Sequence, residues 1–176
     1  MSSMTDITEK IATGLEKAFA EHGFAEPSVG DLRDAAGVSM RTLYKYAPSR
    51  EDMVRAALEH RHRRYLRLVF EDLPSDPSLA LPAVIDAIAR WMESEAAHGC
   101  LFHAAVAAAP RDEKLLQLLK DHKAEVAERT ARAAGLTGKE TDLTLILEGL
   151  TQSWPLYGKA AVRSAKELGR KLATAA

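Results

Sequence analysis

Apolar residues recur at spacings of three and four along almost the whole chain, and no other feature of the sequence restricts its fold as strongly. This spacing places apolar side chains on one face of an α-helix, whereas a half-buried strand would show strict alternation. No segment sustains such alternation, and no repeat or low-complexity segment interrupts the helical pattern. The sequence therefore predicts an all-α protein of about nine helices.

Glycine, proline and capping residues divide this pattern into segments. The first helix is expected to begin at Asp6, as its N-cap, and to end at His22. A long helix is expected from Ser49 to about Asp72, with acidic residues in its first turn. Pro155 is expected to kink the helix in which it lies. Three short helices are expected at residues 28–36, 40–46 and 101–109. Four more are expected around the apolar residues of 81–92, 115–126, 143–154 and 162–172, the first of these ending at Gly99 and the second near Gly135.

The charge and the cysteine content exclude several classes of protein. Among the 176 residues, 24 are Lys or Arg and 25 are Asp or Glu, so the net charge of −1 cannot attract a polyanion by bulk electrostatics. A single cysteine excludes an internal disulfide framework and a cysteine-based zinc site. The first ten residues lack the apolar core of a secretory signal, and no run of about 18 apolar residues could span a membrane. These observations predict a cytoplasmic protein.

The segment from Ser28 to Arg50 carries the most specific pattern in the chain. Two short helices meet at Gly37, and each has a serine at its N-terminal end. Their apolar residues can form a small shared core: Val29, Leu32, Ala36, Val38 and Leu43. This arrangement is typical of a helix-turn-helix, whose second helix enters the major groove of DNA.

Positive charge is concentrated on the second of these helices and its exit. Residues 39–50 contain Arg41, Lys45 and Arg50 and no acid. Residues 1–60 as a whole carry seven basic and ten acidic side chains, a net charge of −3. The basic residues are therefore gathered where a DNA backbone would lie, and we expect Arg50 to hold a phosphate.

Individual contacts to DNA follow from this placement. Arg41 stands near the start of the second helix, where its side chain is suited to a bidentate contact with guanine. Ser28 and Ser39 stand at helix starts, where a hydroxyl and free N–H groups suit a phosphate. Tyr44 and Lys45 are placed to reach oxygens of the DNA backbone.

Several short motifs in this region also match a known family. They are His22-Gly23-Phe24, Ser28-Val29, Ala36-Gly37-Val38-Ser39, Thr42-Leu43-Tyr44, and Pro48-Ser49 followed by a basic residue and an acid. With these motifs the segment from His22 to Leu58 resembles the N-terminal domain of the TetR family of bacterial transcriptional regulators. The rest of the chain resembles that family only in its pattern of helices.

The resemblance implies a three-helix DNA-binding domain over residues 1–48. It also implies a helical bundle over residues 49–176 that binds a ligand and forms a homodimer on a palindromic operator. Gly30 stands where many members carry a side chain that can reach DNA, so specificity should depend more on Met40 and Arg41. Ala47 replaces a bulky aromatic residue, so looser packing is expected beneath the second helix of the motif. The expected DNA-binding residues are Ser28, Ser39, Met40, Arg41, Thr42, Tyr44, Lys45 and Arg50.

The C-terminal bundle offers a candidate ligand pocket and a candidate dimer face. Aromatic and apolar residues predict a largely apolar or aromatic effector, with His103 or Glu95 as its polar contact. Glu95 could instead belong to a frayed helix end. The pocket residues are expected to be Tyr65, Trp91, Met92, Phe102 and His103, and Phe70 could line the pocket beside them. The alternative for each aromatic residue is packing in the core. The dimer face is expected to contain Leu143, Leu147, Leu150 and Trp154.

A basic run, His60 to Arg64 followed by Arg67, lies on the long helix. One interpretation is a relay or a patch that flanks DNA. The alternative is a solvated helix face with glutamate partners nearby.

Two functions from other classes compete with DNA binding. The pairs Glu59-x-x-His62 and Glu95-x-x-His98 match the ligand spacing of di-iron helical bundles. However, Glu59 points about 100° away from the apolar face, and the neighbouring arginines would repel a metal. The second alternative is a protein-interaction bundle with a degenerate helix-turn-helix.

Neither a catalytic centre nor a cofactor site can be recognised in the sequence. No nucleophile–base pair, glycine-rich phosphate loop or pair of catalytic carboxylates is visible, so no enzyme is expected. The spacing of His98, Cys100 and His103 fits no common metal site, so neither a metal nor another cofactor is expected. The sequence predicts a ligand-responsive transcriptional regulator, a repressor, whose partners are double-stranded DNA, a second copy of the chain and a small effector.

Overall fold

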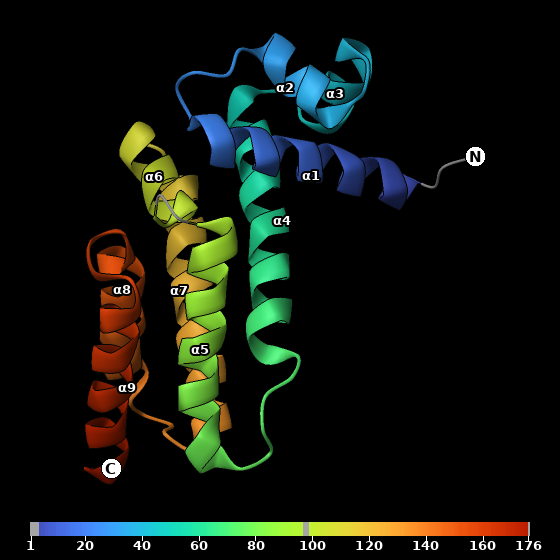
Figure 1. Ribbon diagram of the computed structural model, residues 1–176. Helices are drawn as coiled ribbons and strands as arrows, with labels where there is room; N and C mark the ends of the chain where they lie inside the picture. The colour runs from blue at the N-terminus through green and yellow to red at the C-terminus, as the bar shows by residue number, and fades with distance from the viewer. Residues whose placement is uncertain (1–3, 97–98, 176) are drawn as a thin grey trace. The chain divides into compact units, whose positions relative to one another are not determined.

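The computed structural model describes residues 4–96 and 99–175 as an all-helical protein (Figure 1). These residues form nine helices and no strand, which confirms the predicted fold class. The helices are α1 (Met4–His22), α2 (Val29–Ala36), α3 (Met40–Tyr46), α4 (Arg50–Phe70), α5 (Pro77–Glu95), α6 (Leu101–Ala108), α7 (Glu113–Ala134), α8 (Glu140–Tyr157) and α9 (Lys159–Thr174).

The chain divides into two compact units. The first unit comprises Met1–Arg64 and Leu101–Leu116, and the second comprises Tyr65–Cys100 and Gln117–Ala176. Helix α4 therefore supplies its first part to one unit and its last turns to the other. The functional division expected between residues 48 and 49 stays a prediction.

The core of the first unit is built where α1 approaches α2 very closely. Leu15 and Phe19 of α1 are completely buried, and so is Leu32 of α2. Gly14 makes this approach possible, because a Cβ atom at that position would lie 2.3 Å from the carbonyl oxygen of Ala35. A larger residue at position 14 would therefore force the two helices apart.

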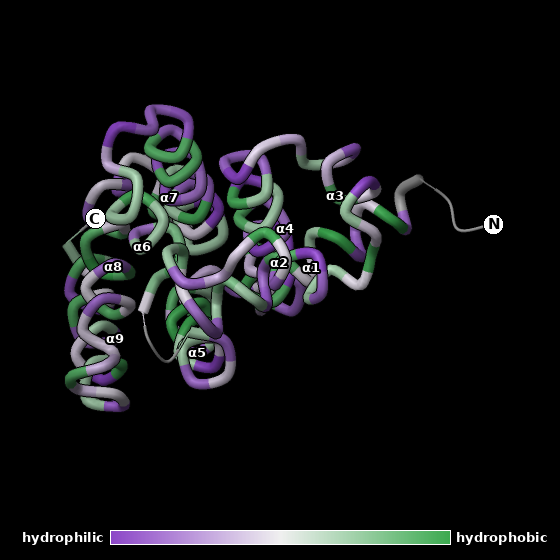
Figure 2. Tube along the Cα trace, turned by 90° about the horizontal axis from the view of Figure 1, so that it is seen from above, coloured by the Kyte–Doolittle hydropathy of each residue, from purple (hydrophilic) through white to green (hydrophobic). Residues whose placement is uncertain are grey.

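The core of the second unit gathers the apolar faces of α5, α8 and α9. Ile85 and Ile88 of α5 are completely buried, as is Leu143 of α8. Figure 2 shows hydrophobic and hydrophilic residues mixed along the helices, as expected of amphipathic helices. Within the described residues, none of these helices combines the length and the apolar character needed to cross a membrane.

Three of the differences between observed and expected helix bounds concern α1, α4 and α8. Helix α1 already includes Met4, so Asp6 lies in its first turn and is not its N-cap. Helix α4 ends at Phe70, two residues before the expected end. Helix α8 continues through Pro155 to Tyr157, because a proline so near the end of a helix removes a single backbone hydrogen bond.

Candidate nucleic-acid interface

The first half of the helix-turn-helix is fixed by a capping box and a left-handed glycine. The backbone N–H of Asp31 donates to Ser28 Oγ over 3.2 Å, and the backbone N–H of Ser28 donates to Asp31 Oδ2 over 2.8 Å. Gly37 ends α2 with φ 62° and ψ 40°, a conformation that glycine adopts without steric cost. These local interactions set the angle at which α3 leaves the turn.

Helix α3 turns one side inward and the other outward. Ser39 caps it by accepting from the backbone N–H of Thr42 over 3.1 Å. Leu43 is completely buried, and Ala47 beneath the helix is only 1% exposed, so the looser packing expected at Ala47 does not leave it open. The outward side presents Arg41, Lys45 and Tyr44, the last with 44% of its surface exposed.

The two helix starts differ in charge. The Ser28 hydroxyl and backbone N–H both bond to Asp31, and they lower the pKa of that carboxyl below its usual value. An ionised carboxylate therefore already occupies the N-terminus of α2, where it would repel a phosphate. Helix α3 has no acid in its first turn, so the start at Ser39 suits a DNA phosphate better than the start at Ser28.

Arg50 has a structural role that the sequence did not reveal. Its guanidinium donates to the carbonyl oxygen of Phe24 over 2.8 Å and lies 5.9 Å from the centre of the Phe19 ring. It therefore ties the start of α4 to the segment between α1 and α2. Lys10 supports the motif in a similar way, since its ammonium donates to the carbonyl oxygen of Gly37 over 2.7 Å. Nothing in the local sequence indicates either contact, because the partners lie 26 and 27 residues apart.

The comparison with protein families matches this region. Residues 11–57 match the family described as bacterial regulatory proteins, tetR family. The N-terminal domain belongs to the tetR family. The helix-turn-helix expected from the sequence is thus confirmed as a TetR-family domain, and the matched segment contains α2, α3 and the start of α4.

Solved structures of TetR-family proteins share the fold over nearly the whole chain. A TetR transcription regulator from Haloarcula marismortui is 20% identical, with a TM-score of 0.77 and 98% of each chain covered. A putative TetR-family regulator from Rhodococcus sp. is 19% identical, with a TM-score of 0.73, covering 95% of this chain and 98% of its own. A TetR-family regulator from Streptomyces coelicolor is 18% identical, with a TM-score of 0.70 and 94% of each chain covered. No curated protein matches the chain significantly.

Three of the five expected pocket residues lie in the second unit of this TetR-like chain. Trp91 and Met92 are buried in its core, and the Tyr65 ring lies edge-on to the Trp91 ring at a centroid distance of 5.3 Å. Phe102 and His103 belong to α6 in the first unit. The five-residue pocket therefore stays a prediction.

Other predicted polar groups are also placed. Glu95 is half-buried and is the last residue of α5. Of the residues considered for metal sites, His98 lies outside the described residues. Among the residues that the structure describes, no group of three potential ligands is positioned to hold a metal ion.

The expected dimer residues face inward within a single chain. Leu143, Leu147 and Leu150 are buried in the core of the second unit, and Trp154 is half-buried against it. Other apolar side chains of α8 and α9 are exposed instead: Leu145, Leu156, Tyr157 and Leu168. Periodicity alone could not show which apolar residues of α8 face the chain's own core.

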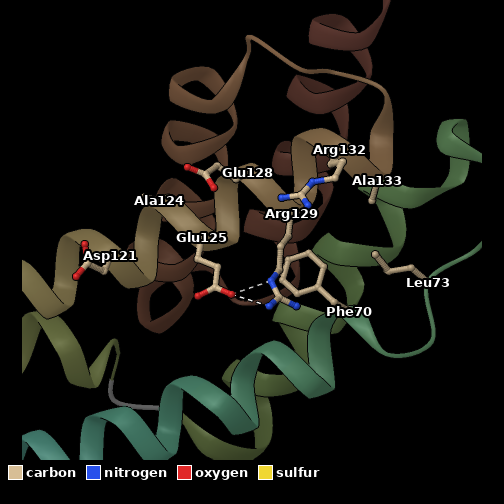
Figure 3. A pocket seen from close by; sticks show the side chains of 9 residues that line it. All are labelled: Phe70, Leu73, Asp121, Ala124, Glu125, Glu128, Arg129, Arg132 and Ala133. Carbon is tan, nitrogen blue, oxygen red and sulfur yellow. Dashed lines mark hydrogen bonds and ion pairs between the residues drawn. The ribbon is translucent and has the colours of Figure 1, made fainter.

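A surface hollow of about 830 Å³ lies beside α7 in the second unit (Figure 3). Arg129 crosses it, bonded to Glu125 over 2.6 Å and placed 5.9 Å from the centre of the Phe70 ring. The hollow carries acidic and basic side chains, and Phe70 is the one residue considered for the pocket that lines it. Its lining consists of Phe70, Leu73, Asp121, Ala124, Glu125, Glu128, Arg129, Arg132 and Ala133.

The basic run on α4 has a buried part and an exposed part, because Arg63 and Arg67 remain exposed. His60 and Arg61 are buried, together with Glu16 of α1, which is 2% exposed. Glu16 Oε1 accepts from Arg61 over 3.0 Å and from Arg64 over 2.7 Å, and Glu16 Oε2 contacts His60 Nδ1. Glutamate partners are present in both parts. Exposed Glu9 pairs with Arg63 as expected for a solvated face, whereas Glu16 forms a buried ion cluster that joins α1 to α4.

Proposed function

We propose that this chain is a transcriptional repressor that binds a palindromic operator as a homodimer and responds to a small effector, without a catalytic step. The observation that carries the proposal is the exposed basic side of α3 in a TetR-family helix-turn-helix. The start of α3 offers free backbone N–H groups, and Arg41 is the second residue of the helix. The guanidinium of an arginine can donate two hydrogen bonds to one guanine, so α3 suits the major groove. A DNA target places the protein in the cytoplasm.

In this proposal some side chains of α3 contact bases and others contact phosphates. Arg41 reads a guanine, and Met40 and Thr42 lie beside it near the groove. Ser39, Tyr44 and Lys45 position the helix on the phosphates, which carry no sequence information themselves. Arg50 supports the motif through Phe24 and contributes little direct contact to DNA.

The dimer is proposed to form through the outer faces of α8 and α9. Leu145 of α8 and Leu168 of α9 line a shallow apolar hollow of about 430 Å³ in the second unit. Gly149 lies in the same hollow, and a Cβ atom added there would meet nothing within 4 Å in this chain. A self-complementary face of this kind permits the two-fold symmetry that a palindromic operator requires.

Regulation is proposed to act through α4, because this helix contributes to both units. An effector bound in the second unit would change DNA affinity only if it favoured one conformational state over another. The aromatic residues Tyr65 and Trp91 support an apolar or aromatic effector.

The proposal is tested by selecting bound sequences from a pool of random DNA duplexes. We expect enrichment of a palindrome whose half-sites are contacted by Arg41. Arg41→Ala should lower the affinity for the selected duplex by about 1–3 kcal/mol and relax the preference at one base position of each half-site. The Lys45→Ala variant is the control, because loss of a phosphate contact should weaken binding to all duplexes alike. Selection of no sequence, or equal losses on selected and random DNA, would contradict the proposal.

A further inference from the structure

A cluster of ionisable side chains lies inside the second unit, whereas α3 belongs to the first. The ammonium of Lys123 on α7 lies 2.6 Å from Glu148 Oε1 on α8 and 3.5 Å from the Cys100 thiol. The side chains of Lys123 and Glu148 are only 17% and 22% exposed. Removing an ion pair from water to this extent seldom stabilises a fold, so the pair calls for a functional explanation.

Tyr65 of α4 is the aromatic member of this cluster. Its ring lies edge-on to Trp91 at 5.3 Å and to His122 at 5.2 Å, measured between ring centroids. Burial raises the pKa of Tyr65 well above its usual value, and the nearby Cys100 and Glu148 raise it further. The phenol therefore stays neutral and keeps its O–H as a hydrogen-bond donor.

The Tyr65 hydroxyl is not sealed inside the protein. Among the described residues it has no hydrogen-bond partner, yet none of their side-chain nitrogens or oxygens is buried without a partner. The residue also retains part of its solvent-accessible surface. The hydroxyl oxygen therefore keeps some solvent-accessible surface.

Lys123 offers a second donor. An ammonium has three N–H groups, and those of Lys123 meet Glu148 and Cys100 among the residues that the structure describes. One N–H group is left for another acceptor. Since the charges of Lys123 and Glu148 cancel, this ion pair adds no net charge beside the two donors and the aromatic rings.

We propose that this cluster is the polar end of the effector site, and that it selects a neutral aromatic molecule carrying a carbonyl-type acceptor oxygen. A carboxylate would be repelled by Glu148, and a cation would be repelled by Lys123. This inference rests on the proposed function, since it assigns chemistry to the effector of that regulator.

Three probes of one shape test the charge that the site prefers: benzamide, benzoate and benzamidinium. Binding to the full chain is measured by ligand-observed NMR at millimolar probe concentrations. Cys100 is the only cysteine, so slower alkylation by iodoacetamide reports occupation of this place. We expect benzamide to bind most tightly and to slow the alkylation. Tighter binding of benzoate or benzamidinium, no detectable binding of benzamide, or bound benzamide without slower alkylation would overturn the proposal.

Variants of the two donors test their roles. Lys123→Met and the conservative Tyr65→Phe should each weaken benzamide binding about tenfold, which is the usual loss for one hydrogen bond. Lys120→Met changes an exposed lysine on the same helix and should leave the affinity unchanged. An unchanged benzamide affinity in Tyr65→Phe would overturn the proposal even if Lys123→Met failed to fold. DNA selection with the same protein separates the two proposals, because operator binding without benzamide binding refutes only the effector chemistry.

Discussion

Two arginines on neighbouring helices show how far one residue type can differ in role. Arg41 is exposed at the start of α3, where nothing in the described chain restrains its guanidinium. Arg50 is half-buried, bonded to Phe24 and placed over the Phe19 ring. Both were expected to contact DNA from their position in a basic segment, and that expectation stays untested. The structure gives Arg50 a second task that local sequence cannot display.

Arg50→Ala should therefore act mainly on stability. Loss of the hydrogen bond to Phe24 and of the contact with the Phe19 ring should lower the free energy of unfolding by about 1–2 kcal/mol. Chemical denaturation followed by circular dichroism measures the change. An unaltered unfolding curve with a uniform loss of DNA affinity would instead identify Arg50 as a phosphate contact.

At the scale of the element, the helices depend on caps and on one buried ion cluster. Ser49 and Asp52 form a capping box at the start of α4, where Asp52 Oδ2 accepts from the Ser49 backbone N–H over 3.1 Å and from its hydroxyl over 2.8 Å. These hydrogen bonds lower the pKa of Asp52 below the ordinary value of 3.8, and the bond from the Ser49 hydroxyl has the largest effect. The cap is therefore strongest while the carboxylate is ionised.

The sign of the pH dependence follows from that lowered pKa. Stabilisation by Asp52 is fully present above the ordinary carboxyl pKa of 3.8 and is lost as the pH falls through the lower value of the folded state. Asp52→Asn should therefore flatten the decline of the melting temperature below about pH 4. Glu51→Gln, in the same turn but outside the capping box, is the control. If the melting temperature of Asp52→Asn falls as steeply with decreasing pH as that of the wild type, the role of the Asp52 carboxylate is contradicted.

The buried cluster around Glu16 predicts a larger effect. Glu16→Gln would leave His60, Arg61 and Arg64 with no carboxylate at their centre, and breaking a buried ion cluster costs about 3–5 kcal/mol. Glu9→Gln removes an exposed partner of His60 and Arg63 and should cost less than about 1 kcal/mol. Urea denaturation measures the free energy of unfolding of both variants. Similar losses in the two variants would show that burial does not determine how much this cluster stabilises the fold.

Local sequence patterns predicted the helices and the helix-turn-helix because the interactions that begin and end these helices join residues close together in the sequence. The caps at Ser28 and Ser39 and the left-handed Gly37 are of this kind. The cluster at Glu16 could not be found in that way, because its partners His60 and Arg61 lie 44 and 45 residues further along the chain. The basic run was visible, but its surroundings are made by packing of α1 against α4.

At the scale of the whole molecule, the proposed dimer requires an apolar surface that the single chain leaves exposed. Leu143, Leu147 and Leu150 form the regular apolar stripe of α8, and they are buried in the core of the same chain. The residues left outside, such as Leu145 with 69% of its surface exposed, do not follow that stripe. One chain's periodicity cannot reveal a surface whose partner is another chain.

A charge placed on the outer face should therefore separate the copies without unfolding them. Leu145→Glu or Leu168→Glu should turn a dimer into a monomer with an unchanged circular dichroism spectrum, because both side chains are exposed in the single chain. Light scattering at micromolar concentration measures the mass. Leu150→Glu is the contrast, since it places the charge in the core and should unfold the second unit. A monomeric wild-type protein would contradict the proposed dimer.

Two of the glycines within helices, Gly14 and Gly149, should tolerate substitution very differently. At position 14 the carbonyl of Ala35 leaves no room for any side chain, so a library of all residue types, selected for folded protein, should return glycine alone. At position 149 the chain itself leaves open space, and alanine would favour the helix by about 1 kcal/mol. Selection for folding alone should thus enrich alanine at 149. If selection for repression instead returns glycine at 149, a second molecule must exclude the larger side chain. Substitution at this one position would then locate a contact that is absent from the single chain.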